Sequence, residues 1–256
     1  MPKNKKMGRC RLCGKYGELS YEHLPPKAAF NNKPTKMYNG IDILTNNKKT
    51  GNGFADICYE NQQKGAGGYT LCSTCNNITG AKYNIEYQKF VNALGNIILS
   101  TDNDLPYNIS FTSNPLDCLA IFKQIMSMFC SISDTCSFDT NLCDFILDEN
   151  STSFNSSKYQ LYIYGVHKAS KIGRICGDTI LLKQNGDKIK LSEISYFPIG
   201  LILDMTNCQH SYNIKGCDIT DLSKFRYGEK NQIEMSMPIH IVNSEIISSF
   251  ATLENL

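Results

Sequence analysis

Apolar and polar residues alternate, or recur at helical spacing, in two separate stretches of the chain. In the first stretch, residues 18–23 and 69–72 are predicted as short strands, and Pro25 and Pro26 end the first strand because proline has no N–H to donate to a ladder. A helix is predicted from about Asn76 to residue 98, where apolar residues recur at helical spacing. Residues 28–67 are rich in Asn, Lys and Gly and are predicted as a long loop, most clearly at 45–53.

The second stretch predicts a helix followed by several strands. The apolar run from Leu116 to Ile132 is typical of a buried helix, and residues 101–115 carry the turn residues of a linker. Strands are predicted at 158–166, 179–183, 188–191, 194–204 and 233–242, with a short helix at 218–225. We therefore expect an α+β protein with domains at 1–100 and 116–256, the second built on a mainly antiparallel sheet.

Length and composition are those of an ordinary globular protein. The chain has 256 residues, of which 41% are hydrophobic, so one large or two small domains are expected. There is no apolar run of membrane-spanning length and no N-terminal signal pattern, so we expect a soluble, cytoplasmic protein without a membrane partner. The chain has twelve cysteines, and those outside the paired motifs are scattered, which is typical of buried thiols in a reducing compartment.

Charge is distributed unevenly along the chain. Residues 1–90 carry 14 Lys/Arg against 6 Asp/Glu, a net charge of +8, whereas the rest carry 12 against 18, a net charge of −6. A basic first third is compatible with a phosphate-rich partner such as nucleic acid, although a solvated basic surface explains the same asymmetry. The acidic remainder is compatible with docking of a protein partner.

Four cysteines occur as two Cys-x-x-Cys pairs. The first pair is Cys10 and Cys13, and the second is Cys72 and Cys75. Four thiolates in two such pairs can close a tetrahedral zinc site, so the sequence predicts a structural Zn²⁺ that joins segments far apart in the chain. Between the pairs stands Glu22-His23-Leu-Pro-Pro-Lys27, and Asn76-Asn77 follows the second pair directly.

These motifs together resemble the HNH endonuclease family, in the subgroup with a zinc-stapled ββα-metal unit, over residues 8–90. The resemblance implies that His23 is the general base and that Glu22 and Asn76 hold one divalent metal ion. Mg²⁺ or Mn²⁺ suits so few hard ligands. The resemblance also implies a nucleic-acid substrate, DNA more than RNA, with Lys27, Lys48, Lys49 and Lys82 as phosphate contacts. We expect a role in bacterial or phage defence, and this expectation rests on analogy with the family alone.

Two positions depart from the family pattern. Many HNH proteins have a second helical metal ligand four residues after the first, where this chain has Gly80. Many also have an Asn before the second strand that orients the catalytic histidine, and here only Asn52 or Asn61 is available from the loop. The alternative function is a non-catalytic, zinc-stapled module that binds nucleic acid or docks a partner. In that alternative, Glu22 and His23 are structural strand-end residues.

Overall fold

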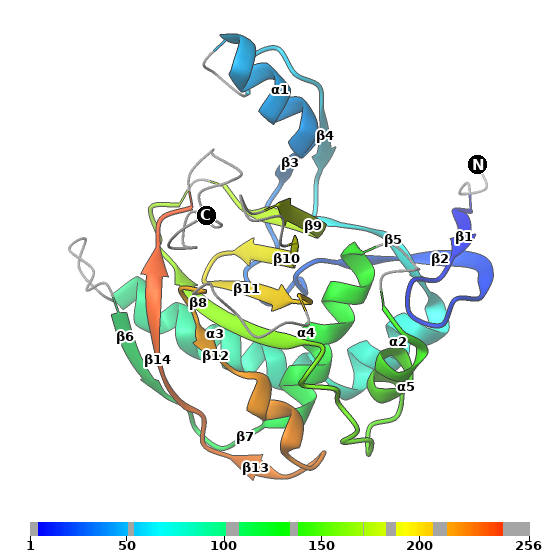
Figure 1. Ribbon diagram of the computed structural model, residues 1–256, viewed down its shortest axis with the longest axis vertical. Helices are drawn as coiled ribbons and strands as arrows, with labels where there is room; N and C mark the ends of the chain where they lie inside the picture. Colours follow the sequence, from blue (N-terminus) through cyan, green and yellow to red (C-terminus); the bar gives the residue numbers. More distant parts are fainter. Residues whose placement is uncertain are drawn as a thin grey trace.

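The computed structural model describes residues 5–50, 54–100, 108–133, 138–170, 172–182, 188–206 and 214–242. This part of the chain is a mixed α+β structure whose strands pair mostly antiparallel (Figure 1). The first elements are β1 (Met7–Arg9), β2 (Tyr16–His23), β3 (Thr35–Tyr38), α1 (Gly40–Thr50), β4 (Tyr59–Gln62), β5 (Gly67–Cys72), α2 (Ser73–Lys82) and α3 (Asn84–Ser100).

The remaining elements follow in chain order. They are β6 (Asn108–Thr112), β7 (Leu116–Asp117), α4 (Cys118–Ile132), α5 (Thr140–Leu147), β8 (Gln160–Val166), β9 (Arg174–Leu182), β10 (Lys188–Tyr196), β11 (Ile199–Asp204), β12 (Cys217–Asp218), the 3-10 helix η1 (Thr220–Lys224), β13 (Lys230–Asn231) and β14 (Glu234–His240).

Strands β1, β2 and β5 form a small antiparallel sheet with β2 in the middle. Helix α2 follows β5 directly and packs against both β2 and β5. A bulge between Ser20 and Tyr21 shifts the register, so that Tyr21 lies opposite Tyr69 and His23 lies opposite Gly67. We call these segments, residues 7–23 and 67–82, the cysteine unit. Two antiparallel strands followed by a helix is the order that the resemblance implies, whereas identity with an HNH unit stays a prediction.

Residues 33–50 and 54–64 form an arm that projects from the body of the protein (Figure 1). Strands β3 and β4 pair only with each other, and α1 lies between them in sequence. The prediction of a long loop over 28–67 was wrong where β3, α1 and β4 lie, including residues 45–50, which belong to α1. Asn39 starts this helix because its side-chain oxygen accepts the N–H of Ile41, at 2.9 Å. The mainly polar composition of the helix concealed it in the sequence.

The larger sheet has the strand order β6-β14-β8-β11-β10-β9, with β12 paired to β8. Its β14–β8 pair is parallel, and its other pairs are antiparallel. One face of this sheet packs against α3 and α4, whose apolar side chains join Leu161, Ile163 and Leu201 in a single cluster. The opposite face carries a smaller cluster that includes Tyr164 and Ile202.

A single hydrophobic cluster connects the cysteine unit to the larger sheet. It includes Cys10, Leu71 and Cys75 from the cysteine unit together with the buried side chains of α4 and the helix-facing residues of the sheet. Helix α4 is buried from Cys118 to Ser131. The predicted division into 1–100 and 116–256 stays a prediction. Of the predicted linker, 108–112 form strand β6 and pair with β14, and 101–107 lie outside the described residues.

Several predicted elements are confirmed, and two are corrected. Helix α4 and strands β8 and β14 lie close to where the apolar spacing predicts them. The predicted helix at 76–98 is two helices, because the chain breaks at Tyr83, which is fully buried and donates its hydroxyl to the Ile146 carbonyl, at 2.7 Å. The predicted strand at 194–204 is the hairpin β10–β11, which turns at Phe197–Pro198 because proline cannot continue a central ladder.

Candidate functional site

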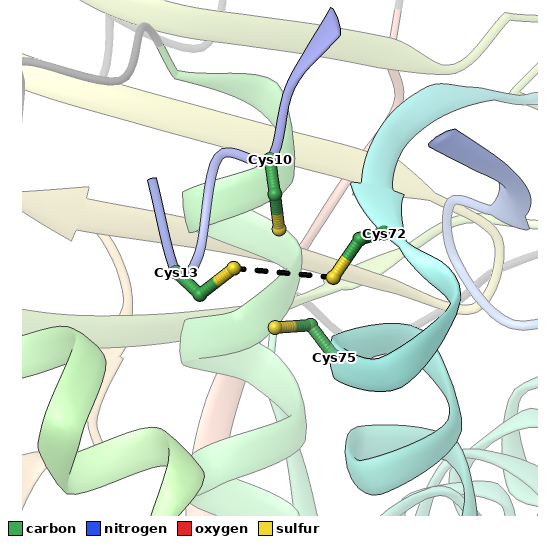
Figure 2. A group of neighbouring side chains, drawn as sticks. All are labelled: Cys10, Cys13, Cys72 and Cys75. Carbon is green, nitrogen blue, oxygen red and sulfur yellow. Dashed lines mark hydrogen bonds between the residues drawn. The ribbon is translucent and has the colours of Figure 1, made fainter. Parts of the chain in front are cut away.

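The two Cys-x-x-Cys pairs converge on one cluster (Figure 2). Cys10 and Cys13 lie in the turn after β1, Cys72 ends β5, and Cys75 lies in the first turn of α2. The four sulfur atoms all lie within 4.8 Å of one another, and those of Cys13 and Cys72 are 3.9 Å apart. Such a cluster can hold a metal ion such as zinc, as predicted from the spacing of the cysteines.

Short backbone contacts fix the first cysteine pair. Gly14 takes a φ of 70° and donates its N–H to the Cys10 carbonyl at 2.9 Å, which closes the turn between Cys10 and Cys13. A side chain at that φ is strained, so glycine suits this position. The N–H of Arg11 donates to the Thr70 carbonyl at 3.0 Å and so ties this turn to β5 beside the second pair.

The cluster favours a thiolate at Cys10 before any metal is considered. Hydrogen bonding from Cys75 is the largest effect and lowers the pKa of Cys10 to about 4, against the opposing effect of burial. Backbone N–H groups of Cys13, Cys72 and Leu12 lower this pKa further. Donating to that thiolate raises the pKa of Cys75 far above its usual range. Because metals bind thiolates, the four cysteines together have the donor set of a closed, structural site.

His23 ends strand β2 with a ring nitrogen that lacks a partner. Its Nε2 is buried and makes no hydrogen bond to any described residue. Burial lowers the pKa of His23, and the charges of Lys27 and Lys64 lower it further, while hydrogen bonding by the Lys64 backbone opposes them. A lowered pKa keeps the ring neutral near pH 7, which is the form that accepts a proton.

Glu22 is directed into the protein interior. The residue is only 9% exposed, and burial raises the pKa of its carboxyl to about 7. The charge of Cys10 raises it as well, whereas Ser131 and Arg11 lower it. Arg11 in turn donates to the Ser131 carbonyl at 2.6 Å, so the end of α4 contributes to the surroundings of Glu22.

Asn76 lies on α2 against the middle of β2. Its amide nitrogen donates to the Ser20 hydroxyl at 3.1 Å and to the Tyr21 carbonyl at 3.3 Å. These bonds place Asn76 beside the backbone that precedes Glu22 and His23. Among the described residues, no hydrogen bond joins the side chains of Glu22, His23 and Asn76 to one another, so their common metal ion stays a prediction.

The four predicted phosphate contacts have different surroundings. Lys27 is exposed and its charge acts on His23, whereas Lys82 forms an ion pair with Glu149. Lys48 and Lys49 lie in α1, but their side chains fall outside the described part of the structure. Of the two whose side chains the structure describes, Lys27 is the one whose charge acts on the candidate base.

Asn31 is a residue that the sequence interpretation missed. It is fully buried at the junction of the arm and the cysteine unit. Its amide nitrogen donates to the carbonyls of Pro25 and Ala66, at 2.6 and 2.7 Å, and its oxygen accepts the Ala66 N–H at 2.7 Å. Gly65 is needed beside it, because a Cβ there would lie 2.2 Å from the Asn31 carbonyl.

The hydrogen bonds of Asn31, which we call the clasp, join the Pro25 and Ala66 backbones and do not reach His23, so Asn31 does not fill the histidine-orienting role considered for Asn52 or Asn61. Asn61 lies exposed on β4, and Asn52 lies outside the described residues. The only signal of Asn31 in the sequence is its position a few residues after Pro25-Pro26 in a polar stretch. That signal does not distinguish Asn31 from the exposed Asn32 next to it.

Gly80 leaves the side of α2 open where the family pattern has a second ligand. A Cβ built at Gly80 meets no atom within 4 Å. A ligating side chain would therefore have room at position 80, and it is absent only because the residue there is glycine.

No family model, curated protein or solved structure matches the chain. The described residues contain no helix that is both long enough and apolar enough to cross a membrane.

Proposed function

We propose that this protein is a metal-dependent endonuclease of the HNH type, with DNA as its main substrate. The observation that carries the proposal is His23, which has a lowered pKa and a buried, unpartnered Nε2 at the end of a strand. The four-cysteine cluster and Asn76 support it, because Cys72, Cys75 and Asn76 lie on β5 and α2, which contact the strand that carries His23. Perturbed titratable groups of this kind concentrate at functional sites.

In this proposal His23 removes a proton from the attacking water. The neutral ring would accept that proton at Nε2, which makes no hydrogen bond within the described residues; because this nitrogen is buried, the proposal requires that substrate binding expose it to the attacking water. Hydrogen bonding by the Lys64 backbone helps to hold the ring in place. Glu22 and Asn76 would hold the divalent ion, which supplies charge stabilisation to the departing oxygen. The cysteine cluster would hold a separate structural zinc ion.

The alternative is a non-catalytic module that binds nucleic acid or a partner. The burial of Glu22 favours this alternative, since a carboxyl with a pKa of about 7 is partly protonated at neutral pH and a protonated carboxyl is a poor metal ligand. In this alternative the cysteine cluster has a purely structural role.

Cleavage of plasmid DNA and of RNA in Mg²⁺ or Mn²⁺ tests the proposal, with His23→Ala as the decisive variant. We expect His23→Ala to lower the cleavage rate by about 10²–10⁴-fold, because a positioned base contributes that much. Glu22→Ala and Asn76→Ala should also cleave slowly, and added Mn²⁺ should partly restore them but not His23→Ala. Equal cleavage by wild type and His23→Ala across several metals would instead favour the alternative.

His167→Ala is the control for a histidine outside the proposed site, because His167 directly follows β8, is buried, and accepts the Ala169 N–H at Nδ1, at 3.0 Å. Zinc content and the thermal midpoint should be recorded for every variant. These two measurements distinguish a variant that cleaves slowly because it lacks a catalytic group from one whose cysteine unit is unfolded.

A further inference from the structure

Three aromatic rings form a row from the protein surface to the candidate base. The ring of Tyr69 on β5 contacts the ring of Tyr21 edge-on, with centroids 5.4 Å apart. Tyr21 in turn contacts the ring of His23 at 5.2 Å. Tyr69 is 47% exposed, whereas Tyr21 is half-buried and its hydroxyl lies within hydrogen-bonding distance of Gln62 and of the Gly65 carbonyl. The row therefore begins with an exposed tyrosine whose ring is braced by a second, fixed ring.

Two exposed lysines accompany this row. Lys27 follows the proline pair after β2, and Lys64 precedes β5, so the two lysines come from the two ends of the connection between these paired strands. Both charges act on His23. The residues of β5 opposite Glu22 and His23 are Gly68 and Gly67, so the neighbouring strand presents no side chain at this end.

We propose that Tyr69, Lys27 and Lys64 form a binding surface for one nucleotide of an unpaired nucleic-acid strand. A base stacks on Tyr69, and its phosphate lies against Lys27 and Lys64, next to His23. The inference rests on the proposed function, because it takes nucleic acid as the ligand of this site.

The exposed aromatic face selects an unpaired strand over a duplex. Within a duplex each base is already stacked between its neighbours, so its face is not available to a protein ring without unpairing. Unpaired bases stack readily on aromatic side chains, and a positively charged surface follows their backbone. A partner that used only the lysines would not require the exposed ring of Tyr69.

The experiment measures binding of the full chain to a fluorescein-labelled single strand of about 12 nucleotides, a length within the usual site sizes. Fluorescence anisotropy is recorded without added divalent cation, so that no cleavage is needed for a signal. We expect Tyr69→Ala to weaken binding by about 5–100-fold, as loss of one stacked base would. Tyr69→Phe keeps the ring and should bind within about twofold of wild type.

Tyr16→Ala is the matched control. Tyr16 is a more exposed tyrosine, at 71%, and lies at the other end of β2, where it pairs with Arg9 of β1. It should bind as wild type does. The double variant Lys27→Gln/Lys64→Gln should lower affinity and make the slope of log K against log salt concentration about 0.7 less steep, as loss of one phosphate contact on a single strand would.

The proposal is overturned if Tyr69→Ala binds the single strand as wild type does, or if Tyr16→Ala loses as much. It is also overturned if Tyr69→Ala loses as much affinity for a duplex of the same sequence, or if wild type binds no single strand. Failure of the proposed function is a different result. Wild type would then bind the single strand through Tyr69 but cleave nothing in Mg²⁺ or Mn²⁺.

Discussion

The cysteine unit and the arm are neighbours in sequence, yet they are held in very different ways. The cysteine unit contributes Cys10, Leu71 and Cys75 to the main hydrophobic cluster and carries four sulfur ligands within 4.8 Å of one another. The arm, by contrast, has no buried side chain among its described residues, and a small group of half-buried and exposed rings around Tyr38 holds it. A substitution that disrupts the cysteine unit should therefore destabilise the whole protein, whereas one in the arm should affect only the arm.

Loss of the zinc ion predicted at the four-cysteine cluster should give the largest loss of stability. Zinc bound to such sites contributes about 10–16 kcal/mol of apparent binding free energy, which is comparable to the whole stability of a typical domain of about 5–15 kcal/mol. We expect Cys75→Ser to lose one zinc ion per chain and the cooperative thermal transition of the whole protein, because the core is continuous. Elemental analysis and circular dichroism measure both.

The exposed Cys58 provides the matched control, since it lies outside the cluster. Cys58→Ser should keep its zinc and its thermal midpoint. If Cys75→Ser instead unfolds only residues 7–82 in hydrogen exchange and leaves the larger sheet protected, the two parts are separate folding units.

Removing the clasp at Asn31 should have an intermediate effect, because it lies where the two regions meet. Asn31→Ala leaves the buried N–H and carbonyl of Ala66 and the carbonyl of Pro25 without this partner. We expect a loss of about 2–4 kcal/mol in the free energy of unfolding, measured by urea denaturation. The exposed neighbour Asn32→Ala should change it by less than about 0.5 kcal/mol. Equal effects of the two variants would show that the clasp does not stabilise the fold.

Removing the central ring of the arm should have the smallest effect on global stability. Tyr38→Ala removes the ring contacts to Phe54 and Tyr59, at 5.1 and 5.4 Å. We expect faster amide exchange at residues 35–62 but a change of less than about 1 kcal/mol in the free energy of unfolding, because no core side chain is lost. A loss as large as that of Asn31→Ala would mean that the arm is part of the cooperative core.

Elements with strong local signals were predictable from the sequence. Helix α4 follows an apolar run, and β8 alternates apolar and polar residues, so both could be placed from local pattern alone. The break at Tyr83 was not predictable, because it depends on the burial of that ring and its hydrogen bond to Ile146, which is distant in sequence. Helix α1 was missed because a polar helix outside the core shows little apolar periodicity.

The sequence by itself identified the four cysteines that could hold a metal ion, since thiolates at Cys-x-x-Cys spacing can close a tetrahedral site where the fold brings them together. Only the tertiary structure decided how the other candidates are placed. It buries Glu22 beside Arg11 and Ser131, leaves Nε2 of His23 without a partner among the described residues, and uses Asn31 to join the Pro25 and Ala66 backbones. The physical reason is that burial and hydrogen bonding depend on neighbours from distant segments. Residue spacing, in contrast, is a local property that the sequence shows directly.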